Sequence, residues 1–383
     1  MTFCLSHKIK LNPTLEQEKW FVKACGVARF TYNLGLEAWN TWYKQGRKFS
    51  YRDIRKEFNR SKDENFPWCR EVSSKITEYA FENLNQAFSR FFKRNSQYPK
   101  FHKKGQNDAF TIYPVKLDGK YVKIPRLGYV KMTESLRLNG IILDRAVISR
   151  DGSYWFISIT VEVDTDQFKQ VDNQNRVGVD LGLSKSVVLS TGEVFKAPKP
   201  LQRNLDKLAK VQRRLSRKAK GSSNRHKQLM KLRKLHYKIK STRLDWIHKV
   251  TAYLTSTFKY IAIEDLAVSN MLKNRKLSRA ISDIGWYEFK RQILYKAVLH
   301  DCEVIVADRF FPSSKTCNSC GVVNDSLRLS DRIFQCDCGH TCDRDLNASL
   351  NLRDLIPTAG GKFTPVDSVA YSNRIVQLPK HAD

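Results

Sequence analysis

Three acidic residues in separate segments have the types and surroundings needed for metal-dependent hydrolysis. Asp180 lies in Val-Gly-Val-Asp-Leu-Gly, Glu264 in Tyr-Ile-Ala-Ile-Glu-Asp-Leu, and Asp345 in Asp-Arg-Asp-Leu-Asn-Ala. Asp180 and Glu264 each end an apolar segment typical of a buried strand, and Asp345 begins a segment with a helical pattern. Carboxylates from adjacent strand ends can share two Mg²⁺ ions that support phosphodiester hydrolysis. The three residues therefore predict a two-metal site, with Asp265 and Asp343 as the neighbouring alternatives.

Four of the nine cysteines have the spacing of a zinc ribbon. Cys317-x2-Cys320 and Cys336-x-Cys338 are separated by fifteen residues, which allows two turns to supply four thiolates to one structural zinc ion. Cys342 follows closely, and we interpret it as a bystander. The other cysteines are scattered and need no role beyond packing: Cys4, Cys25, Cys69 and Cys302. A ribbon alone would suit a transcription factor or a ribosomal protein, but its position just before Asp345 indicates that it serves the catalytic domain.

The chain is strongly basic for its size. Its 383 residues carry a formal net charge of +30, and 41% of them are hydrophobic, as in a globular protein. So much uncompensated charge opposes compact folding unless a polyanion neutralises it, which favours a nucleic-acid partner. No apolar run reaches the length of a membrane span, so we expect a cytoplasmic protein without a membrane partner.

The densest basic stretch is predicted to form a helical hairpin. Residues 201–254 contain two leucine-lined helical patterns joined by a Gly-Ser-Ser turn, and only two acids lie between residues 199 and 249. An apolar seam with a cationic outer face fits a phosphate backbone. Candidate nucleic-acid-binding residues from this stretch and from the basic linker at 96–108 are Arg213, Arg214, Arg217, Lys218, Arg225, Lys231, Arg233, Lys234, Lys100, Lys103 and Lys104.

The remaining segments predict a multidomain α+β chain. Residues 1–12 alternate like a strand, and Thr14 with Gln17 has the spacing of a capping box that opens the first helix. Short β patterns between 110 and 166, broken by glycines, predict a small β-barrel completed by the N-terminal strand. We further expect helices at 51–60, 72–95, 284–300 and 346–355, a β-hairpin at 175–192, and buried strands at 260–263 and 304–307. Leu350 and Leu352 are expected on the apolar side of the last helix.

Several motifs together resemble the TnpB family, the RNA-guided nucleases of bacterial insertion sequences that are related to type V CRISPR effectors. They are His-Lys-Ile-Lys-Leu-Asn-Pro-Thr-Leu-Glu-Gln at 7–17, Ala-Arg-Phe-Thr-Tyr-Asn at 28–33, Tyr-Pro-Lys-Phe at 98–101, Gly-Val-Asp-Leu-Gly at 178–182, Ile-Glu-Asp-Leu at 263–266, Pro-Ser-Ser-Lys-Thr-Cys-Asn-Ser-Cys-Gly at 312–321, and Asp-Arg-Asp-Leu-Asn-Ala at 343–348. The chain departs from the family at its second cysteine pair, which is one residue closer than in many members, and at Cys342. The acidic residues are all present.

The resemblance implies a domain organisation and a set of partners. It implies a RuvC-like (RNase H-like) α/β nuclease domain at 171–312 and 343–356, with a zinc-ribbon target-loading insert at 313–342. It also implies an OB-like β-barrel wedge domain at 1–12 and 96–170, a helical recognition domain at 13–95 and a flexible C-terminal tail at 357–383. The implied partners are a guide RNA, with one protein per RNA, and double-stranded target DNA in the bacterial nucleoid.

By the same resemblance, the protein reads a short DNA motif beside its target, between the recognition helices and the wedge barrel. The candidate readers are hydroxyl-bearing residues that would serve equally well as caps and surface groups: Ser50, Tyr51, Ser73, Ser74, Thr77 and Thr111. The expected activity is RNA-guided cleavage of double-stranded DNA. Two alternatives remain open, a guide-directed DNA-binding regulator that does not cleave and a DDE-like transposase.

Overall fold

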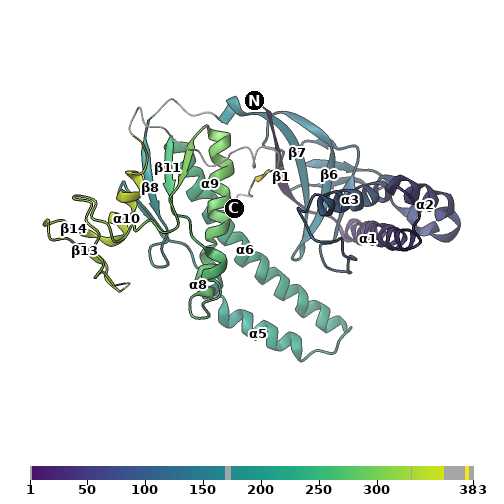
Figure 1. Ribbon diagram of the computed structural model, residues 1–383. Coiled ribbons are helices and arrows are strands. Elements are labelled where there is room, and N and C mark those ends of the chain that lie inside the picture. The colour runs from purple at the N-terminus through teal and green to yellow at the C-terminus, as the bar shows by residue number, and fades with distance from the viewer. Residues whose placement is uncertain (1, 169–173, 329, 358–375, 379–383) are drawn as a thin grey trace. The chain divides into compact units, whose positions relative to one another are not determined.

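The structure of the protein is a computed structural model that describes residues 2–168, 174–328, 330–357 and 376–378 (Figure 1). The chain divides into two compact units, one of residues 4–163 and the other of residues 1–3 and 164–383. Among the described residues, no helix combines the length and the apolar character needed to cross a membrane.

Three helices form the α-helical part of the first unit: α1 (Leu15–Lys44), α2 (Tyr51–Asn65) and α3 (Ser74–Phe92). The predicted capping box is confirmed, because Thr14 accepts a hydrogen bond from the Gln17 backbone N–H at 3.3 Å and its own N–H donates to the Gln17 side chain at 3.0 Å. α1 and α3 approach so closely that a Cβ on Gly35 would lie 2.9 Å from side-chain carbons of Phe81 and Leu84.

The strands of the first unit are divided between two sheets. One has the order β1-β7-β6-β2 and the other the order β3-β4-β5. An antiparallel bridge between Leu11 and Met132 joins them, as does a hydrogen bond from the Val115 N–H to the Asp144 carbonyl at 2.9 Å. Their bounds are β1 (Thr2–Leu11), β2 (Ala109–Ile112), β3 (Lys116–Asp118), β4 (Tyr121–Ile124), β5 (Gly128–Lys131), β6 (Ile141–Asp151) and β7 (Tyr154–Asp164). The strands thus form two linked sheets where the sequence predicted one small barrel.

The second unit is built on a five-stranded sheet of order β10-β9-β8-β11-β12. β8, β11 and β12 are parallel, while β9 is antiparallel to both β8 and β10. The bounds are β8 (Arg176–Asp180), β9 (Val187–Leu189), β10 (Val194–Phe195), β11 (Tyr260–Ile263) and β12 (Glu303–Val306). The expected hairpin and the buried strand β11 are confirmed, and a strand forms at β12 as expected, but only Val304 of β12 is buried.

Helices cover both faces of this sheet. The helices of this unit are α4 (Pro200–Arg203), α5 (Leu205–Ser216), α6 (Ser223–Thr257), α7 (Val268–Met271), α8 (Ser278–Ile284), α9 (Trp286–His300) and α10 (Arg344–Arg353). Large residues of β8 and β11, such as Val179 and Ile263, pack in a core with α6 and α9, whereas Ala262 packs with Leu352 of α10 on the other face. α5 and the first part of α6 form the predicted hairpin (Figure 1). No residue of α5 is fully buried, so the expected apolar seam is only partly covered.

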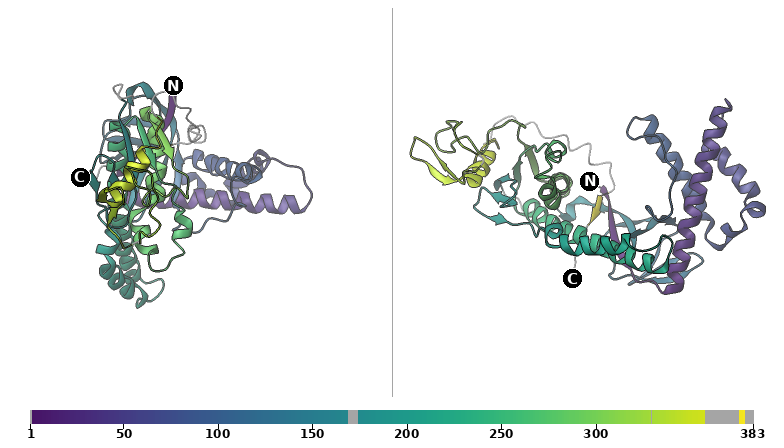
Figure 2. Two further views of the ribbon diagram at one scale, coloured as in Figure 1. Left: turned by 60° about the vertical axis from the view of Figure 1, so that its left-hand side comes forward. Right: turned by 90° about the horizontal axis from the view of Figure 1, so that it is seen from below.

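The cysteine-rich segment lies beside α10 (Figure 2). It contains the antiparallel strands β13 (Ile333–Gln335) and β14 (Thr341–Asp343), and β14 leads directly into α10. The expected apolar side of this helix is only partly correct, because Leu352 is buried but Leu350 is half-buried. The polar residues Asn347, Ser349 and Asn351 are buried instead of Leu350. The two asparagines are buried because this side of α10 faces backbone carbonyls of the cysteine-rich segment, to which they donate hydrogen bonds. β15 (Val376–Leu378) ends the described chain, and the rest of the predicted flexible tail, after residue 357, lies outside the described residues.

Candidate active site and zinc centre

The ends of β8 and β11 place Asp180 beside Glu264. Gly178 pairs with Ala262 and Val179 with Ile263 in the parallel register, so Asp180 and Glu264 follow at the same level. Successive side chains of a strand point to opposite faces. Asp180 and Glu264 therefore share the face of Gly178 and Ala262, which is the face covered by α10.

α10 brings the third carboxylate to this face. Asp345 is the second residue of the helix, and the Asp343 side chain caps the helix by accepting hydrogen bonds from the N–H groups of Asp345 and Leu346 at 3.1 and 3.2 Å. The helix lies directly on β8, because a Cβ on Gly178 would overlap the Ser349 carbonyl oxygen and the Arg353 nitrogen. The glycine of Val-Gly-Val-Asp thus permits the approach that brings Asp345 toward Asp180.

The three carboxylates lie close enough to interact electrostatically, with Asp180 buried and Glu264 and Asp345 half-buried. Burial raises the pKa of Asp180 well above its usual value, and the charges of Glu264 and Asp345 raise it further. Burial also raises the pKa of Glu264, with a smaller contribution from Asp345, while a hydrogen bond from Ser313 opposes the shift. Carboxylate oxygens are the donors that hard divalent cations such as Mg²⁺ favour, so Asp180, Glu264 and Asp345 are the candidate ligands for such an ion.

The two neighbouring acids are engaged elsewhere. Asp265 forms ion pairs with Lys290 at 2.7 Å and Arg309 at 2.6 Å, and the hydrogen bond from Lys290 is the main cause of its lowered pKa. Asp343 caps α10 and pairs with Lys185, whose Nζ also lies 3.9 Å from Asp345 Oδ2. Their carboxylates are therefore poorer metal ligands than the three predicted ones.

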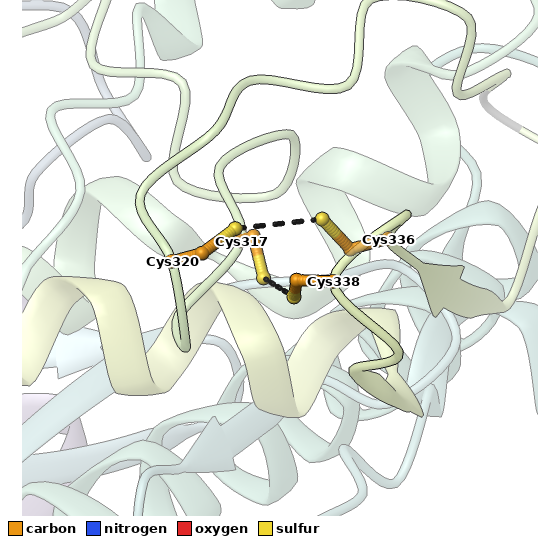
Figure 3. A group of neighbouring side chains, drawn as sticks. All are labelled: Cys317, Cys320, Cys336 and Cys338. Carbon is orange, nitrogen blue, oxygen red and sulfur yellow. Dashed lines mark hydrogen bonds between the residues drawn. The ribbon is translucent and has the colours of Figure 1, made fainter.

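The four predicted cysteines converge (Figure 3). Their Sγ atoms all lie within 4.8 Å of one another, with Cys317 and Cys338 at 3.7 Å and Cys320 and Cys336 at 3.5 Å. Thiolates bound tetrahedrally to zinc at about 2.3 Å are separated by about 3.8 Å, so these side chains fit a structural zinc ion. Although burial opposes ionisation, hydrogen bonds from backbone N–H groups lower the pKa of Cys317 to about 7, which favours the thiolate. Cys342 lies outside this group of four.

Comparison with known proteins identifies the family. The model of the OrfB_IS605 family, described as "Probable transposase", matches residues 158–275, a Cas12f1-like TNB domain matches 286–352, and a helix-turn-helix domain of OrfB_IS605 matches 1–48. A Streptomyces pristinaespiralis protein named as an RNA-guided DNA endonuclease is 36% identical over 355 residues, covering 90% of this chain and 87% of the relative. The chain belongs to the TnpB family. A second relative with this designation, from Escherichia coli K12, is 33% identical over 367 residues and is covered over 90% of its length.

Solved structures agree at the level of the fold. The Cas12f1 protein from a complex with guide RNA and target DNA superposes with a TM-score of 0.54 at 14% identity, covering 89% of this chain and 83% of that protein. At this identity the likeness concerns the fold alone. The likeness supports a mixed α/β fold of several domains for this TnpB-family chain.

The basic residues predicted in this TnpB-family protein are mostly exposed. Arg213, Arg214, Arg217 and Lys218 of the α5 region, Lys231 and Lys234 of α6, and the linker residues Lys100, Lys103 and Lys104 are all exposed. Arg225 differs, because its guanidinium donates to the carbonyls of Leu215 and Lys218 at 2.9 and 3.1 Å. These bonds connect the start of α6 to the end of α5 across the turn of the hairpin. Arg233 is half-buried.

The six candidate motif readers have ordinary local roles in the structure. Ser50 and Ser73 are the N-cap residues of α2 and α3, whose first residues are Tyr51 and Ser74. Thr77 is buried, and its hydroxyl donates to the Ser74 carbonyl at 2.8 Å. Thr111 is buried in β2 and lines a cavity of about 150 Å³ together with Arg29 and Tyr79.

Two side chains of the site were not predicted from the sequence. Ser313 donates a hydrogen bond to Glu264 Oε1 at 2.8 Å, and Lys185 pairs with Asp343. Ser313 belongs to the Pro-Ser-Ser-Lys-Thr-Cys motif that the family resemblance already marked, so its motif was a usable signal. Lys185 has no comparable signal, because its position depends on how the loop after β8 folds.

Proposed function

We propose that this chain is the RNA-guided DNA endonuclease of an insertion sequence and that it cuts double-stranded DNA at Asp180, Glu264 and Asp345. The observation that carries the proposal is the convergence of three carboxylates on one face of the sheet in a chain of net charge +30. The naming of relatives at 33% and 36% identity as RNA-guided DNA endonucleases supports it.

The strand order supports an RNase H-like nuclease domain at 171–312 and 343–356. Numbered within the domain, the order is 3-2-1-4-5, with Asp180 ending the central strand and Glu264 ending its parallel neighbour. The cysteine-rich insert at 313–342 would be the target-loading ribbon. In the first unit, the helices support a recognition domain at 13–95, and the two linked sheets support a wedge domain at 1–12 and 96–170.

Asp180, Glu264 and Asp345 would hold a pair of Mg²⁺ ions. When bound, such a pair activates water and stabilises the charge that develops on the phosphate and the leaving oxygen. The chain itself orients the ligands: Ser313 fixes one oxygen of Glu264, and the Asp343 cap fixes the first turn of α10. Lys185 adds a positive charge beside Asp345 that would attract a phosphate.

A guide RNA transcribed from the end of the element would supply sequence specificity, with one protein per RNA, while the protein reads a short motif in the DNA duplex. Exposed arginines of the α5–α6 hairpin suit contact with a phosphate backbone. The six hydroxyl residues proposed as motif readers are testable as a group, because a lost base contact costs about 1–3 kcal/mol of discrimination. A cleavage profile left unchanged after replacing all six would place the reader elsewhere.

The proposal is tested by sequencing the RNA that copurifies with the protein and offering a plasmid library that matches its 3′ end beside a randomised flank. We expect Mg²⁺-dependent linearisation of plasmids that carry one short flanking motif, with no cutting after RNase treatment of the complex. Guided binding without cleavage would identify the non-cleaving regulator. Strand-transfer products would identify the transposase. The matching family model is described as "Probable transposase", so this alternative is tested as well.

A further inference from the structure

α10 buries two amide side chains one helical turn apart. Asn347 and Asn351 are 0% and 7% exposed, and the helix that carries them also carries Asp345. A buried amide without partners costs about 1–3 kcal/mol, so two of them on one helix face call for a specific set of partners.

The partners lie in the loop that leads into the first cysteine pair. Asn347 Nδ2 donates to the Thr316 carbonyl at 2.6 Å, and Asn351 Nδ2 donates to the carbonyls of Ser313 and Thr316, each at 2.7 Å. Both side-chain oxygens accept from Asn318, at 3.1 Å in each case. The two asparagines thus fix residues 313–318, which include the predicted zinc ligand Cys317, to α10.

The same loop also contacts Glu264, the candidate metal ligand that follows β11. Ser313 is 5% exposed, and its hydroxyl donates to Glu264 Oε1 at 2.8 Å while its carbonyl accepts from Asn351. Glu264 is therefore connected to the helix of Asp345 through one serine and one asparagine. Cys317 lies four residues further along the same loop.

We propose that Ser313, Asn347 and Asn351 are positioning residues that couple the zinc ribbon to the metal-binding carboxylates. In this arrangement the folded ribbon holds the 313–318 loop on α10, and the loop in turn fixes the orientation of Glu264 relative to Asp345. The inference deepens the proposed nuclease function and rests on it for the reaction itself. The coupling itself, between the ribbon and Glu264 at the end of β11, can be measured without any cleavage.

The test compares Ser313→Ala, Ser313→Thr and Asn351→Ala with the wild type, each purified as its RNA complex. Ser326→Ala is the matched control, because this exposed ribbon hydroxyl donates to Asn324 within the ribbon. Four quantities are measured: zinc content, melting temperature, target affinity, and cleavage rate at saturating target. Losing one orienting hydrogen bond worth about 1.4 kcal/mol predicts about a tenfold lower rate for Ser313→Ala. We expect its affinity and zinc content to be unchanged and Ser313→Thr to recover the rate.

Hydrogen exchange gives a readout besides activity. In the wild type, zinc removal by a chelator should speed exchange both in 313–318 and in the segment after β11, 264–266. In Ser313→Ala and Asn351→Ala, exchange at 264–266 should be fast with zinc still bound, and chelation should add little. Chelation that leaves 264–266 unchanged in the wild type would overturn the coupling. So would a fall of rate, affinity and zinc content together in Ser313→Ala, because that pattern indicates general unfolding.

The two proposals fail in different ways. If the wild type cleaves no guided target, the proposed function fails, while the exchange experiment still decides whether the ribbon is coupled to Glu264. If the wild type cleaves and Ser313→Ala cleaves equally fast, only the positioning role fails.

Discussion

Replacing Gly178 with alanine tests how the site is assembled, because this glycine lies in β8 directly beneath α10. The added Cβ would overlap the Ser349 carbonyl oxygen and the Arg353 nitrogen, both of which are backbone atoms. Neither can turn away as a flexible side chain would. The helix must therefore move off the strand, and Asp345 moves with it.

The magnitude follows from this overlap. Restoring van der Waals contact requires α10 to shift by roughly 1 Å, and overpacking of this kind costs typically 1–3 kcal/mol or somewhat more. In a unit of about 200 residues such a loss lowers the melting temperature by roughly 5–10 °C. A misplacement of about 1 Å at a catalytic group also costs about a hundredfold in rate, so cleavage at saturating target should fall by about that factor.

The assay measures melting temperature, guided binding and cleavage for Gly178→Ala and for a matched control, Gly26→Ala. Gly26 lies inside α1, and a Cβ added there would meet no atom within 4 Å. Its replacement should therefore leave activity intact and stabilise α1 by up to about 1 kcal/mol. We expect Gly178→Ala to bind its guided target while cutting it slowly. Wild-type melting and wild-type cleavage in Gly178→Ala would refute the close contact of α10 with β8.

Three further predictions concern other parts of the molecule. Cys317→Ser should lower zinc content in elemental analysis and reduce cleavage more than target binding, because the ribbon adjoins Asp345; zinc-free wild-type protein from metal-replete medium would contradict the site. Burial lowers the pKa of Lys296 to about 7, so between about pH 7 and 10 the unfolded chain binds more protons than the folded one. The unfolding free energy of the wild type should therefore rise with pH relative to Lys296→Met, by at most roughly 4 kcal/mol, and a pH-independent difference in denaturant titrations would exclude a buried neutral lysine. Replacing Arg213 and Arg214 with alanine should weaken binding to all target sequences and flatten its dependence on salt in filter-binding titrations, whereas loss at particular sequences only would indicate base contacts.

The parts of the site that follow strand alternation and ligand spacing could be predicted from the sequence. An apolar strand that ends in an acid fixes both the level and the face of its carboxylate, which is why Asp180 and Glu264 could be paired before their register was known. The spacing of the four cysteines likewise limited them to one cluster. In both cases the signal lies in short local patterns, because each acid ends one apolar strand and each cysteine pair spans three or four residues.

The contacts that depend on tertiary packing could not be predicted in this way. Hydrophobic periodicity assigned Leu350 to the buried side of α10, whereas the structure buries Asn347 and Asn351, because their partners are backbone carbonyls in a distant segment. Arg225, which we predicted as a nucleic-acid-binding residue, also donates through Nη1 to the Leu215 carbonyl near the end of α5, a contact that the sequence did not indicate. Polar side chains carry no periodic signal, so their partners emerge only when separate segments are brought together.

The most direct test of the account measures guided cleavage and guided binding for Asp180→Ala, Glu264→Ala and Asp345→Ala. Each should abolish Mg²⁺-dependent cutting and leave target binding intact, because the metal ligands act on the transition state and base pairing supplies the binding. Asp265→Ala is the matched control and should retain most of its cutting, since Asp265 pairs with Lys290 and Arg309. Full cleavage by Asp345→Ala would contradict the assignment of the active site.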